Sequence, residues 1–168
     1  MTVGVDAEGN ADATGKRFFF TAAAGNYLDG IGNQCGADND VNIYPGLLGA
    51  SIDGLVTVGG IDQQNAIWSS SCVGPHVEVL APATGLLTAS IFETDTYRYK
   101  PERLSSGTSW AAPYVAGMAA RLLEMNPHLT PEEIEDTLAA SPSRVDGLPV
   151  AVRLESQPAE GRRRSVRH

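Results

Sequence analysis

The chain has 168 residues, of which 42% are hydrophobic and 19% charged, and its formal net charge at pH 7 is −8. This size and composition predict one globular domain, or part of one, and argue against a generally disordered chain. The acidic balance argues against nucleic acid as a partner, because phosphate binding needs a clustered basic surface.

The two ends of the chain differ from its middle. Residues 1–16 are polar and lack a hydrophobic period, which predicts a loop, and they contain no export signal. Four arginines lie in residues 161–168, so we expect 156–168 to form a basic, solvated tail. No apolar run is long enough to cross a membrane, and we expect no membrane partner. The folded part should lie within residues 17–155.

Short apolar runs predict strands that are buried in a mostly parallel sheet. The run at 18–24 is interrupted only by Thr21, and the chain should turn at Gly25 and Asn26, at the carboxyl end of this strand. In open α/β sheets, active sites collect at that edge. Further strands are predicted at 55–61, 77–82, 87–92 and 149–154.

The loop region after the first strand contains one candidate metal site. Asp38, Asp40 and Asn42 place oxygen ligands at alternate positions, a pattern that suggests calcium. Ile43 stands where an EF-hand needs glycine, and Gly49 stands where it needs glutamate, so a solvated turn is the favoured alternative. We therefore expect no cofactor, with calcium as the one candidate.

Two helices are predicted in the last third of the chain. The first should span 108–125, and because Pro113 is tolerable only near a helix start, Ser109 should lie in the first turn. There the backbone N–H groups lack helical partners, so a serine is well placed to attack a carbonyl. The second helix should start with a capping box and end near 141–142. The first helix has an apolar stripe (Val115, Met118, Ala119, Leu122, Leu123) and a flank of small residues that allows close packing (Ala112, Ala116, Gly117, Ala120). The capping box of the second helix consists of Thr130 and Glu133, with Pro131 at the first helical position, and Leu129 and Ile134 form a hydrophobic staple beside it.

Two motifs resemble those of the subtilisin-like serine proteases, the subtilases. Residues 107–117 follow the pattern G-T-S-x-x-A-P-x-V-A-G, which implies that Ser109 is the nucleophile. Residues 22–26 resemble the family segment A-A-G-N and imply that the Asn26 side chain donates to the oxyanion, whereas without the first motif Asn26 would only accommodate a turn. The resemblance covers about residues 17–140 and also suggests that Ala23, Ala24 and Gly25 form one side of the substrate cleft.

Cys35 and Cys72 are the only cysteines, so they form one disulfide or remain two free thiols. Their spacing excludes a four-cysteine metal site. The resemblance to a mostly secreted family raises the expectation of a disulfide without deciding between the two states.

The catalytic histidine and aspartate motifs of the subtilases do not occur in this chain. The segment 12–15, Asp-Ala-Thr-Gly, is rejected as the aspartate motif because no apolar strand precedes it. His76, His128 and His168 are rejected as the general base because they lie in a loop before a strand, beyond the nucleophile helix and at the end of the tail. We therefore expect the chain alone to be nearly inactive.

Together these features predict an α/β, subtilisin-like three-layer fold with a mostly parallel sheet, of which residues 17–155 form the C-terminal portion. The implied function is that of a serine endopeptidase with a polypeptide substrate, whose aspartate and histidine come from a missing N-terminal half. A secreted full-length parent is expected. The alternatives are a subunit that complements a separate chain and a non-enzymatic binding module built on a relic sheet.

Overall fold

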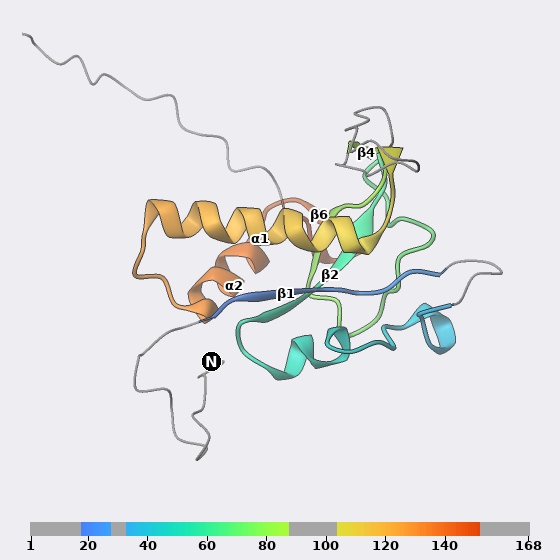
Figure 1. The fold of residues 1–168 in the computed structure, drawn as a ribbon, viewed down its shortest axis with the longest axis horizontal. Coiled ribbons are helices and arrows are strands. Elements are labelled where there is room, and N and C mark those ends of the chain that lie inside the picture. The colour runs from blue at the N-terminus through green and yellow to red at the C-terminus, as the bar shows by residue number, and fades with distance from the viewer. Residues whose placement is uncertain (1–17, 28–32, 88–103, 152–168) are drawn as a thin grey trace, which may run out of the picture.

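A three-stranded parallel sheet forms the centre of the computed structural model, which describes residues 18–27, 33–87 and 104–151 (Figure 1). The strands are β1 (Phe20–Ala23), β2 (Leu55–Ile61) and β3 (Val79–Pro82), in the spatial order β1-β2-β3. All seven residues of the central strand β2 are buried, as expected for a strand that is covered on both faces. The predicted α/β fold with a parallel sheet is confirmed.

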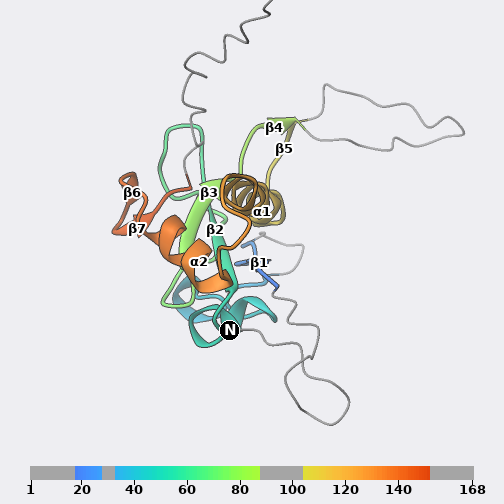
Figure 2. The ribbon, with the colours of Figure 1, turned by 90° about the vertical axis from the view of Figure 1, so that its left-hand side faces the viewer.

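The two helices α1 (Thr108–Met125) and α2 (Pro131–Ala139) pack on the same face of the sheet. Their apolar side chains form one core with Val56 and Val58 of β2 and Val79 of β3. Seen along its axis, α1 lies against the strands (Figure 2). This helix therefore carries its first turn, and Ser109, to the sheet.

The opposite face of the sheet is covered by loops and by the 3-10 turn η2 (Gly46–Ser51), whereas the other 3-10 turn, η1 (Ala37–Asn39), has no buried residue. η2 is fixed to β2 by the Thr57 hydroxyl, which donates to the Gly46 carbonyl at 2.7 Å. Because successive residues of a strand point to opposite faces, Val56 and Val58 face the helices whereas Thr57 faces η2.

The remaining strands are two-residue pairs outside the parallel sheet. β4 (Leu86–Leu87) pairs in antiparallel orientation with β5 (Leu104–Ser105), and β6 (Arg144–Val145) pairs in the same way with β7 (Leu148–Pro149). The strand predicted at 87–92 thus starts in a small hairpin, and its residues 88–92 lie outside the described part, as do residues 152–154 of the last predicted strand. Val150 forms a parallel bridge with Leu80, which extends the sheet beside β3.

The helix boundaries agree closely with the sequence prediction, but one face of α1 does not. The capping box of α2 is present: the Thr130 hydroxyl accepts from the Glu133 N–H at 3.1 Å, and the Glu133 carboxylate accepts from the Thr130 N–H at 2.7 Å. The prediction that Leu123 belongs to the buried stripe is wrong, because Leu123 is exposed. In the small-residue flank, Ala112 is buried, whereas Ala116, Gly117 and Ala120 are exposed.

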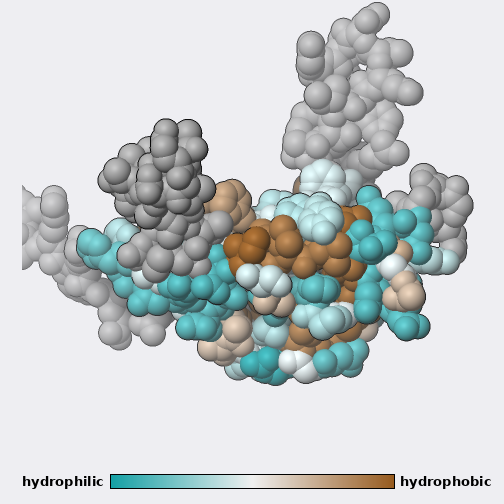
Figure 3. Space-filling view, turned by 90° about the horizontal axis from the view of Figure 1, so that it is seen from below, coloured by the Kyte–Doolittle hydropathy of each residue, from teal (hydrophilic) through white to brown (hydrophobic). Residues whose placement is uncertain are grey.

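The outer edge of β1 has no strand partner among the described residues. The aromatic rings of Phe18 and Phe20 stack there with their centroids 6.0 Å apart, and these residues are 42% and 48% exposed. Figure 3 shows a hydrophobic area on one face of the molecule, bordered by hydrophilic residues. Large apolar side chains exposed together with an open sheet edge are typical of a surface that another segment covers.

A pair of carboxyl groups connects the sheet to α2. Glu78 accepts from the Thr57 N–H at 2.9 Å, and Glu135 accepts from the Gly54 N–H at 3.1 Å. Burial raises the pKa of Glu78 to about 7, and the charge of Glu135 and a hydrogen bond between the two carboxyl groups add to the rise. Arg144 lines the same cavity of about 350 Å³, but its guanidinium donates to the Gly147 and Ala139 carbonyls.

We predict that the protein loses stability as the pH rises through the range in which Glu78 titrates. Glu78 binds its proton more tightly in the folded protein than in the unfolded chain, so the free energy of unfolding should fall by about 2 kcal/mol between pH values of about 4.5 and 7. Urea denaturation at several pH values measures this slope. Glu78→Gln should flatten it, whereas Glu124→Gln on the exposed side of α1 should not; an unchanged slope in Glu78→Gln would contradict the prediction.

Candidate active site

Asn26 lies just beyond the carboxyl end of β1, in a turn that requires glycine. Gly25 has a φ of 101°, which side chains rarely tolerate, and a Cβ atom there would lie 2.9 Å from the Cys72 sulfur. Asn26 then forms an isolated antiparallel bridge with Ser71. The tight turn therefore brings Asn26 to the edge of the sheet that the sequence predicted for the active site.

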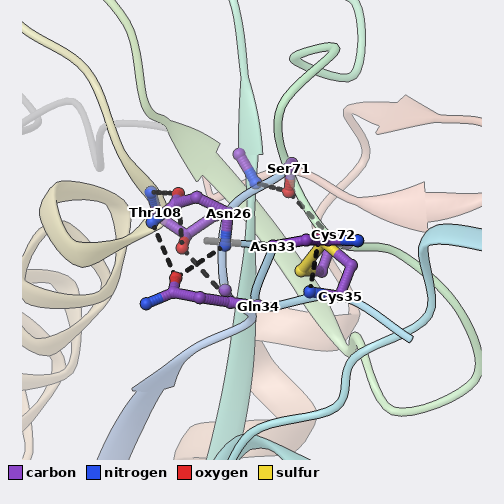
Figure 4. Close-up of a disulfide and its surroundings, with 9 residues drawn as sticks. Asn26, Asn33, Gln34, Cys35, Ser71, Cys72 and Thr108 are labelled. Carbon is purple, nitrogen blue, oxygen red and sulfur yellow. Dashed lines mark hydrogen bonds between the residues drawn. A yellow bond between two sulfur atoms is a disulfide. The ribbon is translucent and has the colours of Figure 1, made fainter. Parts of the chain in front are cut away.

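The Asn26 side chain binds the start of α1, 82 residues further along the chain (Figure 4). Its Oδ1 atom accepts from the Thr108 N–H at 2.9 Å and from the Thr108 hydroxyl at 3.1 Å. The Thr108 hydroxyl in turn accepts from the Gly25 N–H at 3.2 Å. Because the Thr108 N–H can only donate, the side-chain oxygen of Asn26 must face the helix, and its NH₂ group is turned away.

Asn26 performs the task of a helix cap for α1. The N-cap residue, Gly107, has no side chain that could accept from the first N–H groups of the helix. Asn26 satisfies one of them from outside the helix. Thr108 is fully buried in this contact, whereas Ser109, the next residue, is exposed in the first turn.

The structure thus brings the two sequence-predicted residues Asn26 and Ser109 to one end of α1, with Thr108 between them. Thr108 lies in the G-T-S motif, but the sequence alone gives it no role. Its hydroxyl bonds to both Gly25 and Asn26 could not be inferred without the fold. The catalytic roles of Ser109 and Asn26 stay predictions.

The three residues predicted to contact substrate fix the end of β1 in place. Ala24 is fully buried, and its N–H donates to the Val58 carbonyl at 2.9 Å. The Gly25 N–H is bound by Thr108, and the Gly25 carbonyl accepts from the Cys72 N–H at 3.0 Å. Ala23 is half-buried. A role in substrate binding stays a prediction for all three.

The two cysteines form a disulfide, which decides between the alternatives left open by the sequence. Cys35 and Cys72 are both buried and lie beside Asn26 (Figure 4).

The structure does not decide whether the segment 38–42 binds calcium. Across the described ranges no three His, Cys, Asp or Glu side chains cluster as metal ligands. Calcium binding through Asp38, Asp40 and Asn42 stays the untested alternative to the favoured solvated turn.

The described histidines lie away from the first turn of α1. His76 precedes the amino end of β3, whereas Asn26 follows the carboxyl end of β1. His128 lies beyond the far end of α1, which has 18 residues and a length of about 27 Å. His168 and the rejected segment 12–15 lie outside the described residues.

We predict that Thr108→Val destabilises the protein by about 1–3 kcal/mol, because it removes a hydroxyl that bonds to two partners and leaves the buried Gly25 N–H unsatisfied. Thr108→Ser retains the hydroxyl and should cost less. Denaturant unfolding measures both changes. Thr137→Val, which removes a hydroxyl on the exposed side of α2, is the matched control, and an equal loss in the two valine variants would contradict the prediction.

Comparisons with known proteins identify relatives of this chain. A family model for the peptidase S8 group, described as the subtilase family, matches residues 4–153. An alkaline extracellular protease of Yarrowia lipolytica is 37% identical over 106 residues, covering 60% of this chain and 22% of the relative. Subtilisin DY of Bacillus licheniformis is 33% identical over 120 residues, covering 71% of this chain and 38% of the relative.

A solved structure with a similar fold is a cold-adapted subtilisin-like serine proteinase, with a TM-score of 0.54 and 26% sequence identity. The match covers 76% of this chain and 42% of the proteinase. The chain thus spans less than half the length of the relatives it matches. Of the helices that the structure describes, none has the length and apolar character of a membrane span.

Proposed function

The chain belongs to the subtilase family of serine proteases, and from this premise we propose that it supplies the nucleophile and the oxyanion site of a serine endopeptidase. Ser109 attacks the carbonyl carbon of a peptide bond. The side-chain NH₂ group of Asn26 and the Ser109 backbone N–H donate to the carbonyl oxygen, which becomes negative during the attack. The observation that carries the proposal is the bond pair from Thr108 to Asn26 Oδ1, which holds Asn26 beside Ser109.

The start of α1 suits this chemistry for electrostatic reasons. The first N–H groups of a helix carry partial positive charge, which favours an anion near them. Ser109 is exposed to solvent and therefore accessible to a polypeptide, whereas Thr108 is buried and fixes the turn. A donor that is already in place when charge develops needs no reorganisation during the reaction.

The proposed enzyme needs a general base and a carboxylate that orients this base. Both must come from a segment other than the described segments around Ser109. No histidine of the described residues lies at the first turn of α1, as the positions of His76 and His128 indicate. Loss of the histidine alone lowers the turnover of subtilisin about 10⁶-fold. We therefore propose that residues 18–151 alone hydrolyse peptides very slowly.

The open edge of β1 is the proposed docking place for that segment. The stacked rings of Phe18 and Phe20 lie there, and the exposed small residues of α1 leave room for close approach. A methyl group at Gly117 would meet no described atom within 4 Å. A segment that adds a parallel strand to β1 would cover these groups and bring its own histidine to the carboxyl edge of the sheet.

We also propose that the protein works outside the cytosol. Disulfides persist in oxidising compartments, and Cys35 and Cys72 are paired in this structure. The Yarrowia lipolytica relative is named as an extracellular protease. Both observations support an extracellular site of action on polypeptide substrates.

We predict that peptidase activity depends on Ser109 and on an added N-terminal subtilase segment that carries the catalytic aspartate and histidine. The 168-residue chain alone should show no labelling by a fluorophosphonate, because no histidine of the described residues lies beside Ser109 to activate it. Addition of the segment should give labelling and cleavage of an unfolded polypeptide. Ser109→Ala should abolish both, whereas Ser143→Ala, in an exposed loop, should not.

Three outcomes would contradict the proposed function. Labelling of Ser109 in the isolated chain would reveal a base that the described residues do not provide. Residual cleavage by the complemented Ser109→Ala variant, at the level of the Ser143→Ala control, would remove Ser109 from the mechanism. Binding of the segment without any cleavage would favour a non-enzymatic binding module.

A further inference from the structure

We propose that Gln34 is a positioning residue for Asn26 and that the Cys35–Cys72 disulfide holds Gln34 in its place. The inference rests on the proposed role of Asn26 as an oxyanion donor. It assigns a function to a side chain that the motifs of the sequence do not mark. Gln34 lies beside Asn26 in space and eight residues after it in the chain (Figure 4).

Gln34 contacts Asn26 through three hydrogen bonds. Its Oε1 atom accepts from the Asn26 backbone N–H at 3.0 Å and from the Asn26 Nδ2 at 3.3 Å. Its own backbone N–H donates to the Asn26 carbonyl at 3.1 Å. Because a backbone N–H can only donate, the oxygen of the Gln34 side chain must be the atom that faces Asn26.

These bonds leave the Asn26 side chain with one free donor. Its Oδ1 atom has two acceptor positions, and the N–H and hydroxyl of Thr108 use both. Its Nδ2 group has two N–H bonds, of which Gln34 takes one. The second N–H is the one available to an oxyanion, and its direction is set by the two anchors at opposite ends of the amide.

Thr108 alone would not set that direction. A side chain held only at Oδ1 can rotate about the anchored oxygen, so its N–H groups sweep over a range of directions. A second contact at Nδ2 fixes the plane of the amide. A loss of this contact should therefore weaken transition-state stabilisation without changing how the substrate binds.

Gln34 is exposed, so water competes for its hydrogen bonds. Such a bond contributes little unless the partner is kept nearby by other means. The disulfide keeps Gln34 near Asn26, because it links Cys35, the residue after Gln34, to Cys72. The Cys72 N–H in turn donates to the carbonyl of Gly25 at 3.0 Å. The residue after Gln34 is thus tied to the residue before Asn26.

The first experiment measures the Asn26 side-chain amide directly by NMR on the 168-residue chain, with Gln34→Met, Gln34→Glu and the exposed control Gln64→Met. In the parent, the two Nδ2 protons should give separate signals, and one should exchange slowly with solvent. Gln34→Met should at least double that exchange rate and shift the signals, whereas Gln34→Glu, which keeps an acceptor oxygen, and Gln64→Met should not. Unchanged Asn26 signals in Gln34→Met, with the remaining spectrum folded, would overturn the proposal.

The disulfide is tested in the same spectrum. Cys35→Ser with Cys72→Ser should shift the Asn26 side-chain signals in the direction seen for Gln34→Met, while the signals of α2 stay in place. If the signals of Asn26 do not move in this double variant, the disulfide does not hold Gln34 and that part of the proposal is wrong.

The second experiment is kinetic and uses the chain complemented by the segment that carries the aspartate and histidine. Asn26→Ala should lower kcat about 100-fold or more, as expected for the loss of an oxyanion donor. Gln34→Met should lower kcat about tenfold with KM unchanged, and it should have no further effect in the Asn26→Ala background, because a positioning residue acts only through its partner.

The outcomes separate the two proposals. If Asn26→Ala leaves kcat unchanged, the proposed function of Asn26 fails, whatever the NMR signals show. If Asn26→Ala lowers kcat and Gln34→Met does not, only the positioning role fails. Additive losses in the double variant would assign Gln34 a general structural role instead.

Discussion

The contact between Asn26 Oδ1 and the first residue of α1 is the constraint on which this structure depends. A helix leaves its first N–H groups without partners, and Gly107 offers α1 no side chain to satisfy them. Asn26 accepts from Thr108 instead, across a sequence separation of 82 residues. The hydrogen bond that satisfies the start of α1 is therefore also one of the two contacts that orient the Asn26 amide, the other being the contact with Gln34.

This constraint explains the close packing around the end of β1. Asn26 reaches α1 only because Gly25 adopts a positive φ beside the Cys72 sulfur, where a larger residue would collide. The disulfide and the Ser71 bridge hold the opposite side of the turn. Val150 extends the sheet beside β3, whereas β1 has no second strand partner among the described residues.

The sequence predicted the regular elements better than their surroundings. A continuous apolar run is sufficient to predict β2 at 55–61 as a strand buried on both faces. The capping box, which is a local pattern, predicts the start of α2. Leu123 was misplaced because burial depends on what covers a helix, which periodicity does not record. Asn26 and Ser109 are predicted from family motifs. The contact between Thr108 and Gly25 joins residues 83 positions apart, and the contact between Gln34 and Asn26 spans a loop of irregular structure, so neither pairing follows from a local sequence pattern.

Thr108 and Gln34 orient the Asn26 amide, and both belong to the part of the chain that the structure describes. Thr108, Gln34 and the Asn26 backbone fix the donor without any contribution from a histidine. In the proposed enzyme, folding then supplies the free energy that orders the Asn26 donor, before a base is present. A docking segment needs only to bring its imidazole to the exposed hydroxyl of Ser109, so its affinity for the open edge of β1, and not a rearrangement of the oxyanion site, should limit the recovery of activity.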